Sequence, residues 1–269
     1  MPELPEVETV RAAMSRHLVE RRVDAVWTSR KKLRRPVPRA RLQSLPGDRF
    51  VGARRRAKYL LLDLASGRVL LVHLGMTGNL LFRYERSRHD HLRFDLDDGP
   101  PLVYTDARRF GVVDLLAPGR EATCAHLAGL GVEPLSADFD AEYLRAHCRG
   151  RQRPIKNLIM DGRVVVGVGN IYASESLFLA GIRPTARAGR LSRTRLERLV
   201  AEIRSVLQRS IDQGGTTISD YLGSGDGGLF QQELAVYGRT DHGCLVCDAP
   251  IKSIVQAGRS TYYCPRCQR

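Results

Sequence analysis

The chain has 269 residues, of which 43% are hydrophobic and 27% are charged, a balance that excludes a disordered or membrane-embedded protein and is typical of a globular one. Its 43 Lys and Arg residues against 29 Asp and Glu residues give a formal net charge of +14. An excess of this size suits a phosphate backbone, so nucleic acid is the leading expected partner.

A genome rich in G and C is a simpler explanation for the many arginines, because the chain has only five lysines. Codon bias explains arginine in place of lysine but not the excess of bases over acids. Residues 30–58 hold twelve Lys or Arg and a single acid, Asp48, between apolar residues, which indicates a folded basic surface. The acidic start of the chain does not look like a signal peptide, so a cytoplasmic location is expected.

The first half of the chain is predicted to begin with a helix and to continue as antiparallel strands. From Pro5, apolar residues recur every three or four positions, the spacing of an amphipathic helix with proline in its first turn. Between residues 50 and 117, apolar runs alternate with turns such as Ser66-Gly67, a pattern that favours a β-sandwich. Strands are predicted over 59–64, 69–74, 92–96, 102–105 and 112–116.

The second half is predicted to be helical. The strand pattern stops around residues 129–140, where a linker is expected. Helices are predicted over 140–148, 155–161 and 170–180, and a long helix is predicted to follow the N-cap Ser192 and to end at Gly214-Gly215. The glycine-rich residues 216–228 have no periodicity and fit either a lid over a site or an ordinary surface connection.

Four of the six cysteines form two pairs at metal-ligand spacing. Cys244-x-x-Cys247 and Cys264-x-x-Cys267 are separated by sixteen residues, as in a four-cysteine zinc ribbon. Disulfides are the alternative, but a cytoplasmic chain keeps its thiols reduced. We expect one structural Zn²⁺ ion that supplies folding energy to a segment too short to bury much core.

Three further segments carry specific patterns: PELPEVET at residues 2–9, YTDARRFG at 104–111 and VGVGNIYASE at 166–175. Together with the cysteine ribbon, and in this order, they resemble the bacterial formamidopyrimidine-DNA glycosylase family over nearly the whole chain. The resemblance implies a bifunctional DNA glycosylase and AP lyase of base excision repair. Its expected partner is double-stranded DNA that contains abasic sites or oxidised purines, chiefly 8-oxoguanine and formamidopyrimidines.

The resemblance also implies the fold and its division. The expected fold is α+β: an N-terminal antiparallel β-sandwich domain with flanking helices, and a C-terminal helix-two-turn-helix domain that ends in a zinc-ribbon β-hairpin. We expect a catalytic domain over 1–130, a linker over 131–150, a helical DNA-binding domain over 151–235 and a zinc finger over 236–269. A monomer that associates with the bacterial nucleoid through DNA is expected.

The chemistry begins at Pro2, which becomes a secondary amine once Met1 is removed. A model α-amino group has a pKa near 8, so a useful fraction is neutral and able to attack the sugar C1′. By resemblance, Glu3 is the acid that opens the sugar ring, which its adjacency to the nucleophile makes possible. Lys58 is expected to assist β-elimination and Arg259 δ-elimination.

An enzyme that acts on a base extrudes it from the duplex and fills the hole with side chains. By resemblance, Met76 and Phe110 fill that hole and Arg108 faces the orphaned cytosine. Asn170 begins a helix, where backbone N–H groups and the helix dipole favour a phosphate. The other residues expected to contact DNA are His73, His89, Arg151 and Lys156.

The sequence departs from the family pattern at two places, and two alternative functions remain. Ala107 replaces the usual proline of its segment, which should loosen the turn slightly, and residues 216–221 match less well, which leaves the preferred lesion open. An enzyme of the endonuclease VIII type, which prefers oxidised pyrimidines, shares the N-terminal proline but not the ELPE and RRFG patterns. A non-catalytic zinc-containing DNA-binding protein would have the same charge and cysteines, but Pro2, Glu3 and Lys58 are intact.

Overall fold

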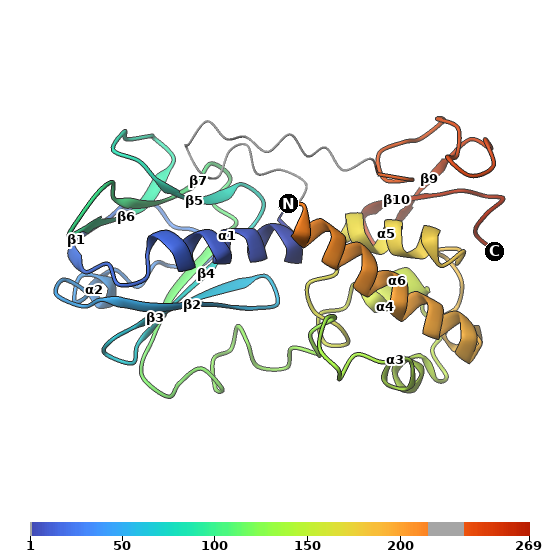
Figure 1. Cartoon of the computed structure of the whole chain (residues 1–269), viewed down its shortest axis with the longest axis horizontal. Helices are drawn as coiled ribbons and strands as arrows, with labels where there is room; N and C mark the ends of the chain where they lie inside the picture. Colours follow the sequence, from blue (N-terminus) through green and yellow to red (C-terminus); the bar gives the residue numbers. More distant parts are fainter. Residues whose placement is uncertain (1, 215–233) are drawn as a thin grey trace. The chain divides into compact units, whose positions relative to one another are not determined.

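The computed structural model describes residues 2–214 and 234–269, so Met1 and the predicted lid loop at 216–228 lie outside the described residues. The described chain forms two compact units (Figure 1). Residues 2–128 form the first unit, and residues 129–213 together with 234–269 form the second.

The first unit contains two antiparallel four-stranded sheets, which confirms the predicted β-sandwich. One sheet has the order β1-β6-β7-β5 and the other the order β2-β3-β4-β8. Most strands bury alternate or successive apolar residues because each inner face packs against the other sheet. The strands of the first sheet are β1 (Val23–Thr28), β6 (Asp90–Leu96), β7 (Leu102–Asp106) and β5 (Gly78–Phe82), and those of the second are β2 (Phe50–Arg56), β3 (Tyr59–Leu64), β4 (Val69–His73) and β8 (Val112–Leu116).

Helix α1 (Leu4–His17) packs on this sandwich along β2 and β3. Pro5 lies in its first turn, as predicted, and its buried face, which includes Val7, Val10 and Met14, joins the core formed by both sheets. A short helix α2 (Arg39–Leu42) lies between β1 and β2 and buries Leu42. The start of the chain is therefore attached to a rigid scaffold.

The sequence prediction omitted β1, β2 and β5. Strand β1 is an edge strand with exposed positions in its middle, and β2 contains three consecutive arginines. Neither pattern resembles the apolar runs that marked the other strands.

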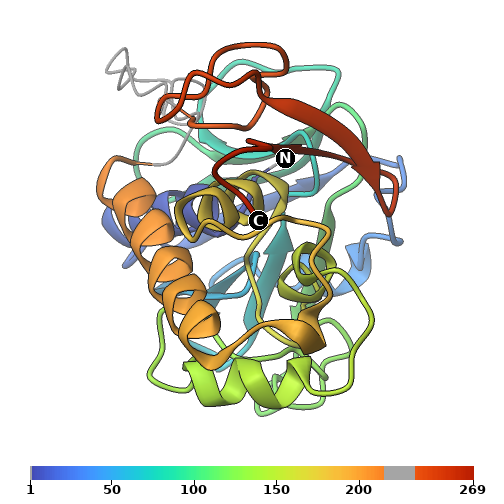
Figure 2. The same cartoon turned by 90° about the vertical axis from the view of Figure 1, so that its right-hand side faces the viewer.

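The second unit is helical and ends in a hairpin, as predicted. Its helices are α3 (Ala141–Cys148), α4 (Ile155–Ile159), α5 (Asn170–Leu179), the 3-10 helix η1 (Ala188–Arg190) and α6 (Arg193–Asp212). Ser192 caps α6 by accepting from the Arg195 N–H, as the sequence predicted. The hairpin of β9 (Lys252–Gln256) and β10 (Arg259–Tyr263) lies against α5, as Figure 2 shows. No helix in the described part of the chain is long and apolar enough to cross a membrane.

Candidate active site and nucleic-acid interface

The candidate nucleophile and acid stand where α1 begins. Pro2 is half-buried, whereas Glu3 is only 2% exposed. Glu6, one turn later, is also buried, and its carboxylate accepts a hydrogen bond from the Glu3 N–H at 2.7 Å. This bond is half of a capping box, which fixes the direction in which the chain enters the helix. Glu3, the residue before the helix, is thus held in place by the Glu6 side chain.

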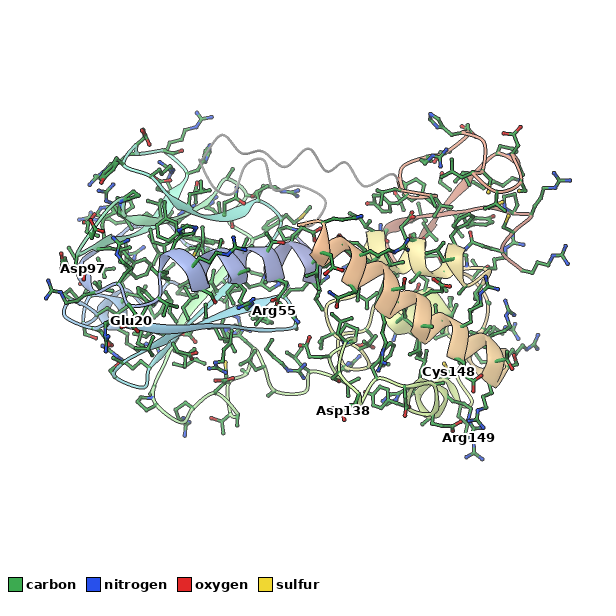
Figure 3. All side chains as sticks on the ribbon, in the orientation of Figure 1. Glu20, Arg55, Asp97, Asp138, Cys148 and Arg149 are labelled. Atoms are coloured by element: carbon green, nitrogen blue, oxygen red, sulfur yellow. The ribbon has the colours of Figure 1, made fainter. Side chains whose placement is uncertain are left out.

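Lys58 lies in the tight turn between β2 and β3. Ala57, the other turn residue, has a positive φ of 56°, as a two-residue hairpin turn requires. Arg55 supports this turn by donating to the Ala57 carbonyl at 2.9 Å, and it also donates to the Glu8 carboxylate of α1 at 2.8 Å. Figure 3 labels Arg55 at the end of this hairpin, beside α1. One guanidinium therefore connects the turn of Lys58 to the helix that follows Pro2 and Glu3.

His73 ends β4 and stacks on Tyr59, with the ring centroids 4.8 Å apart. Burial, together with the charges of Lys58 and Arg34, lowers the pKa of His73 to about 4. Its Nδ1 accepts from the Gly75 N–H at 3.0 Å, so the neutral ring carries its proton on Nε2. His73 is therefore a neutral hydrogen-bond donor at physiological pH, in a basic surrounding that suits a phosphate.

Met76 and Phe110 are 39% and 44% exposed, which is unusual for large apolar side chains unless they serve a contact. The Arg108 guanidinium lies over the Phe110 ring, 4.8 Å from its centroid. These side chains help to line a pocket whose lining is partly apolar and partly basic. It is lined by Lys32, Leu33, Arg34, His73, Gly75, Met76, Arg108, Arg109 and Phe110.

Lys156 differs from the other predicted DNA contacts because only 1% of it is exposed. Its ammonium donates to the Asn170 side-chain oxygen and to the Thr261 hydroxyl, each at 2.7 Å. The Asn170 amide in turn donates to the Ser260 carbonyl at 2.9 Å. The structure therefore places Lys156 beneath Asn170, where it connects the start of α5 to β10, rather than on the surface.

The remaining predicted site residues, Arg259, Arg151 and His89, are at least partly accessible to solvent. Arg259 begins β10 directly after a turn in which Ala257 and Gly258 both have positive φ. Arg151 precedes α4 and is exposed, whereas His89 precedes β6 and is half-buried. Basic or hydrogen-bonding side chains at such loop positions can reach a nucleic-acid backbone.

The four predicted metal ligands lie together. The sulfur atoms of Cys244, Cys247, Cys264 and Cys267 all lie within 4.8 Å of one another, with Cys244 to Cys267 at 3.9 Å and Cys247 to Cys264 at 3.5 Å. A tetrahedral zinc ion with Zn–S bonds of about 2.3 Å requires sulfur separations of about 3.8 Å. All four thiols are free, which excludes the disulfide alternative in this structure. These residues hold one structural Zn²⁺ ion and offer no open position for catalysis.

Sequence reasoning missed several residues that support the site. The Glu175 carboxylate, buried in α5, accepts from the backbone N–H groups of Ala235, Val236 and Tyr237 at 2.7 to 3.0 Å. Arg55 was likewise read only as part of a basic surface. Both residues lie in or beside segments that were singled out, but their partners are remote in the sequence.

Comparisons with known proteins match all parts of this arrangement. Residues 1–113 match the model of the formamidopyrimidine-DNA glycosylase N-terminal domain, residues 130–221 the H2TH domain of the same proteins, and residues 244–269 a zinc finger found in FPG and IleRS. The chain is 51% identical to a formamidopyrimidine-DNA glycosylase of Thioalkalivibrio sulfidiphilus, and the match covers 100% of both chains.

Two solved structures show the same fold over the full length. A complex of Lactococcus lactis Fpg with DNA that contains an abasic site is 33% identical, with a TM-score of 0.89 and 100% of each chain covered. A structure of MutM in complex with DNA that contains carbocyclic 8-oxo-G is 34% identical, again with a TM-score of 0.89 and full coverage of both chains.

Proposed function

This chain belongs to the formamidopyrimidine-DNA glycosylase family, and we propose how its own residues remove oxidised purines from DNA and cut the strand. It is a DNA glycosylase of base excision repair with AP lyase activity. The proposed substrates are 8-oxoguanine and formamidopyrimidines in duplex DNA, which the solved complex of MutM with 8-oxo-G DNA supports. The proposed nucleophile is Pro2 after removal of Met1.

Base release begins when the Pro2 nitrogen bonds to the sugar C1′. The glycosidic bond breaks, and its electron pair leaves with the base. Loss of the proton on nitrogen then lets its lone pair break the C1′–O4′ bond while Glu3 delivers a proton to O4′. An iminium remains, which joins the protein to the opened sugar. The position of the buried Glu3 directly after the proposed nucleophile supports this role, because a general acid must lie within hydrogen-bond reach of its target.

Strand cleavage follows from the iminium. It acidifies C2′, so loss of that proton expels the 3′ phosphate, and a second elimination expels the 5′ phosphate. We assign assistance in the β step to Lys58 and in the δ step to Arg259. The observation that carries this proposal is the bridge of Arg55 between Glu8 and the Ala57 carbonyl, because it holds the turn of Lys58 against the helix that Pro2 and Glu3 begin.

We propose DNA-contacting residues in each of the two units. In the first unit we propose that Met76 and Phe110 fill the space of the extruded base, that Arg108 faces the orphaned cytosine, and that His73 donates from Nε2 to a phosphate. His89 supplies a further contact. In the second unit Asn170 and Arg151 contact phosphates, and Lys156 acts through Asn170. We also propose a cytoplasmic monomer, and the net charge of +14 supports its association with the nucleoid through DNA.

Borohydride trapping tests the mechanism. The mature protein, shown by mass to lack Met1, is incubated with a duplex that carries 8-oxoguanine opposite cytosine, beside a Pro2→Gly variant. We expect a covalent adduct with the wild type and a sharply reduced adduct with the variant. A wild type that forms no adduct with 8-oxoguanine but traps on an oxidised pyrimidine would instead identify an enzyme of the endonuclease VIII type. No adduct with either lesion would contradict the proposed chemistry.

A further inference from the structure

Two neighbouring crossovers carry the side chains that we assign to the space of the extruded base. One crossover connects β4 to β5 and carries Met76; the other connects β7 to β8 and carries Arg108 and Phe110. Each runs from one sheet of the sandwich to the other. Strand β5 pairs with β7 and β4 pairs with β8, so the two crossovers are joined at both ends by strand pairing.

Asp106 lies at the point where both crossovers leave the first sheet. It is the last residue of β7, pairs with Gly78 of β5 and is fully buried. Its carboxylate accepts from the Thr77 hydroxyl at 2.5 Å and from the Gly111 N–H at 2.8 Å. One carboxylate thus bonds the crossover of Met76 through Thr77 and the crossover of Phe110 through Gly111.

Thr77 extends this connection to the residue that we assign to the opposite base. While its hydroxyl donates to Asp106, its oxygen accepts from the Arg108 N–H at 3.1 Å. The main chain of Arg108, at the turn between β7 and β8, is therefore fixed by the crossover that carries Met76. We call Asp106 and Thr77, with these three hydrogen bonds, the crossover clamp.

Backbone packing brings the two crossovers into direct contact, with no space between them for even one additional carbon atom. Gly75 has a φ of +68°, and a Cβ there would lie 2.6 Å from the carbonyl carbon of Phe110 and from the nitrogen of Gly111. A Cβ on Gly111 would lie 1.7 Å from the Tyr104 hydroxyl, which itself donates to Asp106. Main chain meets main chain here, so a shift of one crossover displaces the other.

From these contacts we propose that the crossover clamp sets the discrimination for the base opposite the lesion, with Asp106 and Thr77 as positioning residues. The proposal rests on the function assigned above to Met76, Arg108 and Phe110. A guanidinium offers only hydrogen-bond donors. The pairing edge of cytosine offers two acceptors, N3 and O2, whereas that of adenine offers N1 alone, so a fixed guanidinium can pair more fully with cytosine. Such selection requires that Arg108 be held in place before the duplex arrives, because a mobile arginine could adapt to either base.

The test compares single-turnover excision of 8-oxoguanine opposite cytosine with excision opposite adenine. Thr77→Val keeps the shape of the side chain but removes both hydrogen bonds, Asp106→Asn removes one acceptor, and Thr77→Ser retains the hydroxyl as the matched control. We expect the cytosine-to-adenine rate ratio to fall about tenfold in the first two variants, as for a buried hydrogen bond left unmade. Thr77→Ser should restore the ratio to within about twofold of the wild type.

A second measurement separates this proposal from the proposed function. Borohydride trapping on a single-stranded abasic oligonucleotide needs the nucleophile but no opposite base, so Thr77→Val should trap as well as the wild type. A folded Thr77→Val protein with an unchanged rate ratio would overturn the crossover clamp and leave the glycosylase chemistry standing. If Asp106→Asn fails to fold, the cytosine-to-adenine rate ratio of Thr77→Val alone decides whether the proposal stands. A wild type that does not trap would instead refute the chemistry on which the clamp rests.

Discussion

The Lys156 ammonium donates to the side-chain oxygen of Asn170 at 2.7 Å, so a buried positive charge holds the residue that we assign to a phosphate. A buried ammonium costs solvation energy unless oxygen atoms surround it. The Thr261 hydroxyl, also at 2.7 Å, and the more distant Ser260 carbonyl at 3.3 Å supply such oxygens from β10. Lys156 thus connects α4 to both α5 and the zinc-ribbon hairpin.

Replacement of Lys156 by methionine should therefore weaken both stability and DNA binding. The change leaves the Asn170 and Thr261 oxygens without their shared donor, and we expect a loss of about 2 kcal/mol in the free energy of unfolding. The affinity for abasic-site duplex should fall by about tenfold, because Asn170 is no longer oriented. Denaturant titration and fluorescence anisotropy measure the two effects. Lys252→Met, an exposed lysine of β9, is the control; equal effects of both substitutions would contradict the role of Lys156.

The bridge of Arg55 yields a prediction on catalysis. Arg55→Met removes the connection between Glu8 and the turn of Lys58, and strand cleavage at a preformed abasic site should slow by about tenfold, because small displacements of catalytic groups are costly. The effect should be on kcat, with KM little changed. Quantified cleavage of a labelled abasic duplex gives both constants.

The adjacent Arg54 offers a matched control for Arg55. It pairs instead with Asp63 and Glu121, so Arg54→Met removes a guanidinium from the same strand without touching Glu8. We expect cleavage within about twofold of the wild type, as for most surface substitutions. Cleavage by Arg55→Met at the wild-type rate would show that the turn holds its position without the bridge.

The contacts of Lys156 and Arg55 also show where prediction from the sequence succeeds and where it fails. Strands β3 and β8 were predicted with their observed bounds, because continuous apolar runs between turns are a local signal. The cysteine spacing identified the metal ligands for the same reason. Lys156 was expected to contact DNA, and its burial was not predicted because Thr261, which helps to bury it, is 105 positions away. No local pattern distinguishes a buried lysine from an exposed one.

The strand β2 was missed for a related reason. Its three arginines read as a solvated basic surface, yet Arg54 and Arg55 lie in a paired strand and have carboxylate partners from other elements. A strand tolerates charged side chains when groups of opposite charge pair with them. The sequence does not show which carboxylates these are, because they come from other elements. The supporting residues of the site, Arg55 and Glu175 among them, were hidden from sequence reasoning on the same ground.

The lowered pKa of His73 predicts how stability depends on pH. Its folded-state pKa of about 4 lies below the ordinary histidine pKa of 6.5, chiefly because burial disfavours the charged ring and also because Lys58 and Arg34 are near. Between pH 4 and pH 6.5 the unfolded chain therefore binds more protons than the folded protein. The contribution of His73 to the free energy of unfolding is complete above pH 6.5 and is lost as the pH falls toward 4. Between pH 7 and pH 5, protonation of His73 in the unfolded chain should lower the free energy of unfolding by about 2 kcal/mol.

Urea unfolding of the wild type and of His73→Asn at both pH values measures this contribution. The variant should be less stable at pH 7, since it loses the stacking on Tyr59, but its stability should fall less between pH 7 and pH 5. Equal pH dependence of the two proteins would mean that His73 is not the group responsible.

Removal of zinc should uncouple the ribbon from the helical unit and abolish strand cleavage. The core beneath the ribbon is small: Phe178 of α5 packs with Val236, Ile251 and the metal-ligating Cys264, so few apolar contacts remain once the sulfur atoms lose their ion. A structural zinc site supplies on the order of 10 kcal/mol of folding free energy, more than such a cluster can replace. Arg259 would then be lost to the δ step. Ser260 and Thr261 would no longer support Asn170 and Lys156, so the DNA binding on which both elimination steps depend would fail as well.

Chelation of the wild type should therefore release one zinc ion per chain and eliminate cleavage of abasic DNA, and added zinc should restore it. Cys264→Ser should bind zinc poorly and should not be rescued in this way. Cys124→Ser, which changes a buried thiol of the first unit, is the control and should retain its zinc. A zinc-free protein that still cleaves at the wild-type rate would show that the hairpin keeps Arg259 in place without the metal, and the structural role assigned to the four cysteines would then be wrong.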